Sequence, residues 1–203
     1  MFYIPSIRSA ARKPIGAKLA LKPFHVWGIR IRLQVAHRTR DLALFDLALD
    51  SKLRGCDLLR LRVSDLLSSG GVKQRVVIVQ QKTGRPVQFE VTEQARRSIA
   101  AWADAKQLGP DDWLFPSRMK QGCHLSTRQY ARLVEKWVSL LGLDPSAYGT
   151  HSLRRTKVAL LYKKTGNLRA CQILLGHTKL ESTVRYIGVE VDDALELSEA
   201  LEL

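Results

Sequence analysis

Apolar residues recur at the spacing of an α-helix along most of the 203-residue chain. Val26, Ile29 and Leu33 follow one another at three- and four-residue intervals, and the preceding Pro23 suits the first turn of a helix. This pattern predicts three helices between residues 24 and about 63. The first begins at Phe24, the second spans 42–49 with Asp41 as its N-cap, and the third spans 56–61.

One segment follows a strand pattern instead. Residues 76–81 read VVIVQQ, residues 86–91 read PVQFEV, and KTGR at 82–85 separates them. β-Branched runs on both sides of a short turn that contains glycine are typical of a β-hairpin. We therefore expect a hairpin with Lys82 at its tip.

After the hairpin the helical pattern returns. Thr92 and Ser126 suit the N-cap positions of helices expected at 93–106 and 126–141. The second of these helices has one apolar stripe, formed by Tyr130, Val134, Trp137 and Leu141. Further helices are expected at 152–164, 168–175, 181–187 and 192–201. The sequence thus predicts an α+β fold that is mainly α, a helical domain with a small β-hairpin insertion.

The charge of the chain is unusual for a globular protein, with 33 Lys and Arg against 19 Asp and Glu, a net charge of +14. The first 40 residues hold nine basic residues and no acidic one, whereas 181–203 hold seven acidic residues and one basic. A basic body favours a polyanionic partner such as a nucleic acid, although a ribosomal-type protein or a merely basic enzyme has the same balance. We expect a basic arm at 1–22, a globular region at 23–189 and an acidic tail helix at 190–203.

The cysteines indicate a reducing cytosol rather than a disulfide framework. Cys56, Cys123 and Cys171 are far apart and form no CxxC pair, and adding His124 or His177 does not produce the ligand spacing of a zinc site. We therefore expect no metal. No apolar run approaches the length of a membrane span. The Arg-rich, acid-free first twenty residues also fit an organellar transit peptide, an alternative to a DNA-contacting or solvated arm.

Two motifs near the C-terminus carry residues suited to phosphate chemistry. His151 and Arg154 lie three residues apart where a helix is expected to begin, and a helix N-terminus itself favours an anion. In LLGH, Gly176 suits a left-handed helix stop before His177, and Tyr186 follows nine residues later. Each motif alone also fits an ordinary role, namely a solvated basic helix start, a capping glycine with an incidental histidine, and a half-buried packing tyrosine.

Taken in order, HxxR, LLGH and the tyrosine resemble the C-terminal signature of the tyrosine recombinase or phage integrase family. The family's upstream phrase TGLRxxELLxLxxxDI is similar to residues 51–66, which place Arg54 at the first arginine. The family carries its lysine on a β-hairpin as KTG, which matches Lys82. The resemblance covers residues 24–189 and implies the helical catalytic domain of that family.

Two features depart from the family pattern. Ser51 and Lys52 replace the usual Thr-Gly before the first arginine, which alters a tight turn and adds a charge near the site. Members also commonly carry an N-terminal DNA-clamping domain, whereas here only the short basic arm precedes the catalytic region. We therefore expect weaker autonomous DNA binding, and both a small member of the family and a fragment fit this length.

The resemblance implies a mechanism in which Tyr186 attacks the scissile phosphodiester and leaves a 3′-phosphotyrosine and a free 5′-hydroxyl, without any nucleotide, metal or other cofactor. Arg54 and Arg154 would hold the non-bridging oxygens and stabilise the charge of the transition state. The remaining roles implied are proton transfer near the tyrosine by His151, protonation of the departing 5′-oxygen by Lys82, and a hydrogen bond to a phosphate oxygen from His177.

Double-stranded DNA is therefore the expected partner. The family's helix that enters the major groove corresponds to the one after Ser126, where Arg128, Gln129 and Arg132 are candidates for contacting bases or phosphates, although a solvated polar face fits equally well. Arg12 and Lys13 in the basic arm are further candidates. The family also implies a homo-oligomer, a synaptic tetramer on DNA, in the cytoplasm of a bacterium or of phage origin. The acidic tail either docks on a neighbouring protomer or packs on its own body.

Two other functions share these features. A non-catalytic DNA-binding regulator derived from an integrase would keep the fold, and a type IB topoisomerase would use the same chemistry only to relax DNA. Every predicted catalytic position still holds the expected residue type, which favours a recombinase over the regulator.

Overall fold

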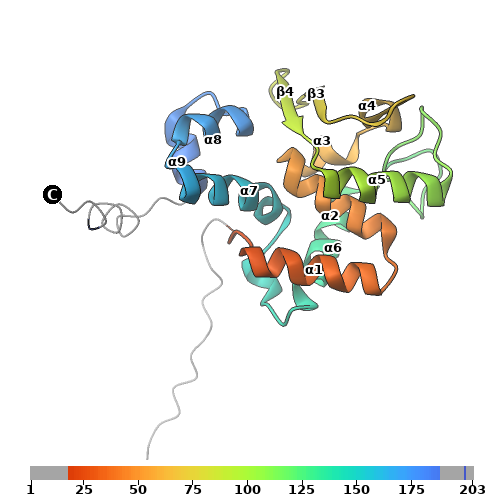
Figure 1. Cartoon of the computed structure of the whole chain (residues 1–203), viewed down its shortest axis with the longest axis horizontal. Coiled ribbons are helices and arrows are strands. Elements are labelled where there is room, and N and C mark those ends of the chain that lie inside the picture. The colour runs from red at the N-terminus through yellow and green to blue at the C-terminus, as the bar shows by residue number, and fades with distance from the viewer. Residues whose placement is uncertain (1–17, 188–198, 200–203) are drawn as a thin grey trace, which may run out of the picture.

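The computed structural model, drawn in Figure 1, describes residues 18–187 and Glu199. The helices of this part are α1 (Pro23–Val35), α2 (Thr39–Ser51), α3 (Gly55–Leu59), α4 (Val63–Leu66), α5 (Glu93–Lys106), α6 (Thr127–Ser139), the 3₁₀ turn η1 (Pro145–Ala147), α7 (Thr150–Thr165), α8 (Leu168–Leu175) and α9 (Leu180–Ile187). The strands are β1 (Leu67–Ser68), β2 (Gly71–Val72), β3 (Arg75–Val79) and β4 (Pro86–Glu90). They pair as two separate antiparallel sheets, β1 with β2 and β3 with β4. The fold is α+β and mainly α, as predicted.

Helix α2 lies at the centre of the larger group of helices and packs against α1, α5 and α7 (Figure 1). It is buried on every side, so its apolar residues, such as Leu44, have almost no contact with solvent. Two of its three buried acidic residues pair with other helices: Asp46 accepts a hydrogen bond from Arg30 Nε at 2.6 Å, and Asp50 accepts one from Lys157 Nζ at 2.6 Å. The second pair ties the centre of the fold to α7.

Two of the three predicted N-caps are present in the structure, those of α5 and α6, and that of α2 is not. Thr92 and Ser126 are the N-caps of α5 and α6, as expected, and their hydroxyls accept hydrogen bonds from backbone amides three residues on, at 3.4 and 3.2 Å. Asp41 as the N-cap of α2 was wrong, because the helix begins at Thr39 with Arg38 in the cap position. Asp41 lies instead in the first turn, where the helix dipole favours a carboxylate, and pairs with Arg40.

The aromatic stripe of α6 packs into the core as predicted. Tyr130 and Trp137 are buried, and the Trp137 ring meets Phe45 of α2 edge to face, with 5.5 Å between ring centroids. The helix ends at Ser139 rather than at residue 141. Gly55 opens α3 against Tyr130, since a Cβ atom there would lie 3.4 Å from the tyrosine ring. This packing fixes the segment that begins immediately after Arg54.

The predicted hairpin is present, with slightly shorter strands. Arg75 pairs with Glu90 at its base and Val79 pairs with Pro86 next to the tip. The tip is closed by backbone hydrogen bonds on both sides of Gln80, whose nitrogen donates to the Arg85 carbonyl at 2.9 Å and whose carbonyl accepts from Gly84 at 2.8 Å. Helix α4 and the small β1–β2 sheet were not predicted, because two-residue strands and one-turn helices are too short to give a periodic pattern.

Helices α7, α8 and α9 pack together as a smaller group with its own apolar centre, apart from the larger core (Figure 1). Val158, Cys171 and Leu175 are completely buried there, and Tyr186 packs against them from α9. The helices at 152–164, 168–175 and 181–187 are thus confirmed within one or two residues. The LLGH motif ends α8 at Gly176, which has φ +64°, the left-handed stop that was predicted.

The segment just before α1 is hydrogen-bonded to η1 and to the first two turns of α7. The backbone nitrogen of Leu19 donates to the Ala147 carbonyl at 3.0 Å, and that of Leu21 donates to the Thr156 hydroxyl at 2.9 Å. Arg155 closes the same junction, because its Nη1 donates to the carbonyl of Lys18 at 2.8 Å. Residues 18–21 therefore form a strap across the first two turns of α7.

Some predictions fall outside the described residues. Arg12 and Lys13 lie there, as does the expected tail helix at 192–201 apart from Glu199. Across residues 18–187, no helix has the length and apolarity needed to cross a membrane. The same stretch contains no cluster of three or more His, Cys, Asp or Glu side chains that could hold a metal ion.

Candidate active site

Tyr186 on α9 lies against the first turns of α7. Its ring centroid is 5.0 Å from the Arg155 guanidinium carbon and 5.7 Å from that of Arg154, and its ring meets the His177 imidazole edge to face at 5.4 Å. Its hydroxyl donates a long hydrogen bond, 3.4 Å, to the backbone carbonyl of His151. The two C-terminal motifs are thus brought together around one phenol.

Arg154 is the most enclosed cation of this group, with 3% of its surface exposed. Its Nη2 donates to the carbonyl of Leu175 at 2.8 Å, at the C-terminal end of α8 where the helix dipole favours a positive charge. Its Nε and Nη1 are buried and have no protein partner among the described residues. Unpaired buried donors cost free energy, and a charged guanidinium with two such donors is suited to bind an oxyanion.

Arg54 reaches the same site from the far side. It occupies the N-cap position of α3, in extended backbone, and its Nη1 donates to Gln80 Oε1 of the hairpin at 2.8 Å. Its charge is close enough to lower the pKa of both His151 and His177. The two arginines therefore set up a region of positive potential in front of the tyrosine, which favours a negatively charged ligand.

His177 follows the left-handed stop at Gly176 and is half-buried. Burial, and then the charges of Arg154 and Arg54, lower its pKa to about 4, so the imidazole is neutral at pH 7. Its Nδ1 lies 3.1 Å from the hydroxyl of the buried Thr183, on α9 one turn before the tyrosine. The other ring nitrogen makes no hydrogen bond to a described residue and is available to a ligand.

His151 lies in the first turn of α7 with only part of its side chain in solvent. Partial burial, followed by the charges of Arg154, Arg155 and Arg54, lowers its pKa. It is therefore neutral at pH 7 and able to accept a proton. Tyr186 has the opposite shift, because burial raises its pKa while Arg154, Arg155 and Arg54 oppose the rise. The hydroxyl contacts the backbone of His151, and a neutral imidazole on that residue is chemically suited to take the phenol proton.

Lys82 shows no contact with the other five predicted catalytic residues. It is exposed at the tip of the hairpin and makes no hydrogen bond or ion pair with another described residue. The tip itself is attached near the site, because the backbone nitrogen of Gln81 donates to the buried Asp57 carboxylate at 2.9 Å. The backbone that carries Lys82 is thus held by hydrogen bonds, whereas its side chain has no partner among the described residues.

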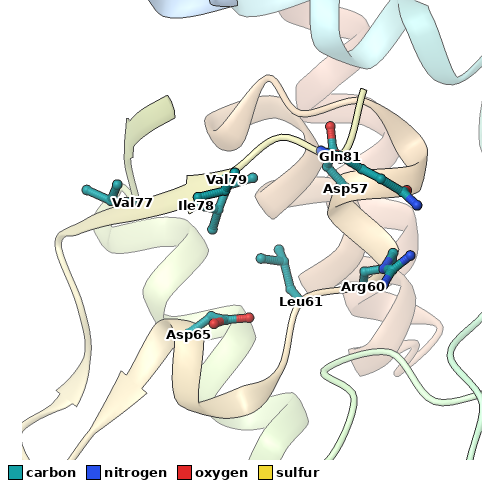
Figure 2. A pocket seen from close by; sticks show the side chains of 8 residues that line it. All are labelled: Asp57, Arg60, Leu61, Asp65, Val77, Ile78, Val79 and Gln81. Atoms are coloured by element: carbon teal, nitrogen blue, oxygen red, sulfur yellow. The ribbon is translucent and has the colours of Figure 1, made fainter. Parts of the chain in front are cut away.

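A cavity of about 420 Å³ opens beneath this attachment, between the outer edge of β3 and the segment from α3 to α4 (Figure 2). Figure 2 shows the side chains of Asp57 and Gln81 next to each other at one end and Asp65 at the other. None of the six predicted catalytic residues lines the cavity. The tyrosine is half-buried beside the exposed His151, whereas Arg154 and Arg155 are buried beneath them.

The candidate DNA-contacting residues of α6 are exposed, as a binding role requires. Arg128 and Gln129 lie in the first turn and Arg132 follows one turn later, all on the solvent side, while Tyr130 and Val134 face the core. Arg40 and Arg118 lie beside Gln129 around a shallow cavity. This arrangement gives the N-terminal end of α6 additional positive charge.

Sequence reasoning missed four residues of the site: Asp57, Gln80, Arg155 and Thr183. Asp57 had a signal, because it occupies the acidic position of the family phrase three residues after Arg54. Arg155 lies directly after Arg154, and the sequence does not distinguish which of two adjacent arginines faces a ligand. Gln80 and Thr183 are ordinary polar residues whose importance depends on contacts between distant segments.

The family model for the phage integrase family matches residues 30–192 of this sequence. The chain belongs to the phage integrase family. It is similar to the tyrosine recombinase XerD of Rhizobium meliloti (strain 1021), with 31% identity over 157 residues, 76% of this chain and 49% of the relative. It is also similar to the probable integrase/recombinase YoeC of Bacillus subtilis (strain 168), with 28% identity over 75% of this chain and 80% of the relative.

Solved structures show the same fold for the family. The XerA recombinase superposes with a TM-score of 0.74 at 17% identity, covering 92% of this chain and 66% of that one. The XerH site-specific recombinase bound to its difH substrate before cleavage superposes with a TM-score of 0.70 at 19% identity, covering 90% and 54%. The chain spans about half the length of the XerD relative. The predicted family and fold are thus confirmed.

Proposed function

We propose that the chain is the catalytic region of a site-specific DNA recombinase of the integrase or invertase type, which breaks and rejoins double-stranded DNA through a 3′-phosphotyrosyl link. The observation that carries the proposal is the buried Arg154 guanidinium with two unpaired nitrogens beside the Tyr186 phenol. A phosphodiester would satisfy those donors and place its phosphorus next to the hydroxyl. Family membership and relatives named tyrosine recombinases support the same reaction.

In the proposed first step, the Tyr186 oxygen attacks the scissile phosphorus, the new P–O(tyrosine) bond forms and the P–O5′ bond breaks. The phenol proton passes to His151, whose imidazole is neutral at pH 7. The number of phosphodiester bonds is unchanged, so the 5′-hydroxyl of a partner strand reverses the step without any nucleotide. The raised pKa of the tyrosine makes this proton transfer necessary at neutral pH.

The other residues act on the phosphate and on the leaving group. Arg54 and Arg154 hold the non-bridging oxygens and stabilise the charge that develops in the transition state. His177 donates a hydrogen bond from its free ring nitrogen to a phosphate oxygen, because Nδ1 lies against Thr183. Lys82 protonates the departing 5′-oxygen, and its exposed place on the hairpin tip allows it to meet DNA lying across the site.

We further propose that α6 enters the major groove, where Arg128, Gln129 and Arg132 contact bases and phosphates. Arg12 and Lys13 would add phosphate contacts. Strand exchange requires two duplexes, so we propose a homo-oligomer on DNA, a synaptic tetramer. The curated relatives are bacterial, and we propose that the reaction takes place in the cytoplasm, where bacterial or phage DNA is found.

The experiment is covalent trapping on a nicked duplex that carries the chain's own attachment site, resolved on a denaturing gel. Cleavage of such a substrate releases a short 5′-hydroxyl fragment, so the phosphotyrosyl adduct accumulates. We expect an adduct with the wild-type chain and none with Tyr186→Phe. No adduct, or an adduct that persists in Tyr186→Phe, would contradict the proposal. Joining of two different duplexes distinguishes a recombinase from a topoisomerase, which only relaxes supercoils.

A further inference from the structure

Gln80 connects two parts of the proposed active site that lie 28 residues apart in the sequence, Arg54 and Lys82. It is the last residue before the hairpin tip, and 1% of its surface is exposed. Its Oε1 accepts two hydrogen bonds, from Arg54 Nη1 at 2.8 Å and from the Thr83 hydroxyl at 3.0 Å. Both lone pairs of the carboxamide oxygen are therefore in use.

The orientation of this side chain follows from chemistry. A guanidinium has only donors, so the atom of Gln80 that faces Arg54 must be the oxygen and not the nitrogen. A hydrogen bond from a charged donor to a buried acceptor is among the stronger ones in proteins. Arg54 is thus held at one of its two terminal nitrogens, and the other end of the fork remains free to meet a phosphate.

The main chain of Gln80 closes the hairpin tip. Its nitrogen donates to the Arg85 carbonyl and its carbonyl accepts from Gly84, which has a φ of +62°. The next nitrogen, that of Gln81, is bound to the Asp57 carboxylate. Any shift of the Gln80 side chain is therefore transmitted to the turn that carries the lysine.

The end of α8 also touches this residue. A Cβ atom added to Gly176 would lie 3.6 Å from both terminal atoms of the Gln80 side chain and 3.0 Å from a methyl carbon of Val87. The loop that presents His177 thus packs directly onto the hairpin at Gln80. Three segments of the proposed site meet at one carboxamide.

We propose that Gln80 is a positioning residue: its oxygen orients the Arg54 guanidinium toward the scissile phosphate and ties that orientation to the hairpin tip that carries Lys82. The catalytic consequence rests on the function proposed above, whereas the orientation of Arg54 does not. A glutamine that only filled a buried space would be replaceable by methionine, which has a similar shape and no acceptor oxygen, without an effect on the arginine.

The first test compares Gln80→Met with Gln88→Met, the same change at an exposed position of β4 on the same hairpin. On the nicked substrate under single turnover, we expect cleavage by Gln80→Met to be about tenfold to a hundredfold slower, the factor that a lost hydrogen bond to a charged group corresponds to. Gln88→Met keeps the wild-type rate. In an Arg54→Ala background, Gln80→Met has no further effect, because the group it orients is gone. An equal loss in both backgrounds would overturn the proposal.

A substrate with sulfur in place of the 5′-bridging oxygen distinguishes an effect of Gln80 through Arg54 from an effect through Lys82. A 5′-bridging phosphorothioate releases a thiolate, which leaves without being protonated and so does not need Lys82. Because the side-chain bond of Gln80 runs to Arg54, we expect the deficit of Gln80→Met to persist on this substrate. Full recovery of the rate would show that Gln80 acts through the lysine alone, and the assignment to Arg54 would be wrong.

Thr83→Val provides a variant at an exposed position, where folding is not at risk. It removes the second donor to Gln80 Oε1 and leaves the bond from Arg54 in place. We expect cleavage about two- to tenfold slower, the effect of one neutral hydrogen bond. An unchanged rate would overturn the tie between Arg54 and the tip.

The last measurement does not depend on catalysis. In the ¹⁵N spectrum of the arginine side chains, with the Arg54 signals assigned by Arg54→Lys, we expect slowed guanidinium rotation in the wild type and fast rotation in Gln80→Met. Equal rotation in both proteins would overturn the positioning role even if cleavage is normal. If the wild type forms no covalent adduct but the rotation differs as expected, the proposed function fails and the role of Gln80 in holding Arg54 stands.

Discussion

Lys52 Nζ lies 2.8 Å from a carboxylate oxygen of Glu90, an ion pair that joins the end of α2 to the end of β4. Lys52 has a φ of +54° and a ψ of 22°, the left-handed conformation that favours glycine, and the family phrase has glycine at this place. Its side chain is 1% exposed, although it carries a charge. The ion pair therefore compensates both for the backbone conformation and for the burial of an ammonium group beneath the loop of Arg54.

This relationship predicts a rescue. Glu90→Ala leaves the buried Lys52 without its partner, and we expect the free energy of unfolding to fall by about 2 kcal/mol or more. In the Lys52→Gly background the same change should cost much less, because no buried charge remains and the glycine suits the left-handed conformation. Urea unfolding followed by tryptophan fluorescence measures all four proteins of the cycle.

Lys157 is the control for this cycle, because its Nζ also contacts Glu90, at 2.6 Å, as well as Asp50. Lys157→Met should destabilise the protein in both the wild-type and the Lys52→Gly backgrounds, since Asp50 remains buried in each. Additive losses for Glu90→Ala and Lys52→Gly would show that the two residues do not compensate each other.

We expect Arg154→Met to reduce cleavage activity strongly while leaving the stability of the fold nearly unchanged. The change removes a buried charge whose Nε and Nη1 have no partner in the described part of the chain, at the loss of one hydrogen bond to Leu175. We expect a free energy of unfolding within about 1 kcal/mol of the wild type, because the loss of that bond is offset by the smaller desolvation cost. Single-turnover cleavage should fall at least about a hundredfold, the effect of removing one oxyanion donor. A strongly destabilised variant would argue that Arg154 has mainly a structural role.

His177 predicts a pH dependence of stability. Its folded pKa of about 4 lies below the unfolded value of 6.5, so the unfolded chain binds the proton more readily between these values. The free energy of unfolding should therefore fall as the pH decreases from 6.5 to 4, and His177→Gln should make the slope smaller. The slope will not disappear, because His151 also has a lowered pKa. Urea midpoints at half-unit pH steps test this, and identical slopes in both proteins would contradict it.

The exposed residues of α6 predict changes in DNA binding without changes in folding. Arg128→Ala, Gln129→Ala and Arg132→Ala should each leave the unfolding free energy within about 0.5 kcal/mol, because all three side chains are in solvent. A lost phosphate contact lowers the slope of log Kd against log salt by about 1, whereas a lost base contact relaxes sequence preference at one position. Arg97→Ala on α5 removes an exposed charge elsewhere and serves as the control. Equal losses from Arg97→Ala and the α6 variants would contradict a specific role for α6.

The parts of the fold that could be predicted are those with long periodic patterns. The stripe of Tyr130, Val134 and Trp137 identified α6, and alternation identified the hairpin, because each pattern extends over several turns or strand residues. Asp41 misled the prediction of the α2 start, because an acidic residue is favoured both at the N-cap and inside the first turn. The preference for a residue type alone does not choose between neighbouring positions.

The sequence identified individual residues of the site but not the hydrogen bonds that connect them. Tyr186, His151 and Arg154 could be named because each lies in a short motif. Gln80 could not, because its role depends on a hydrogen bond to Arg54 across 26 residues. Similarly, Lys52 looked like a disturbance to a tight turn, and only Glu90 in three dimensions explains how a lysine fits there.

The strap formed by residues 18–21 has a mechanical consequence. The Arg155 guanidinium lies over the Tyr186 ring and donates a hydrogen bond to the carbonyl of Lys18, while the Thr156 hydroxyl accepts one from the backbone nitrogen of Leu21. A pull on the chain at Lys18 would thus act on the first turns of α7 before it reached α1. In this molecule, tension applied at Lys18 would therefore be felt by the turns of α7 that lie against the tyrosine.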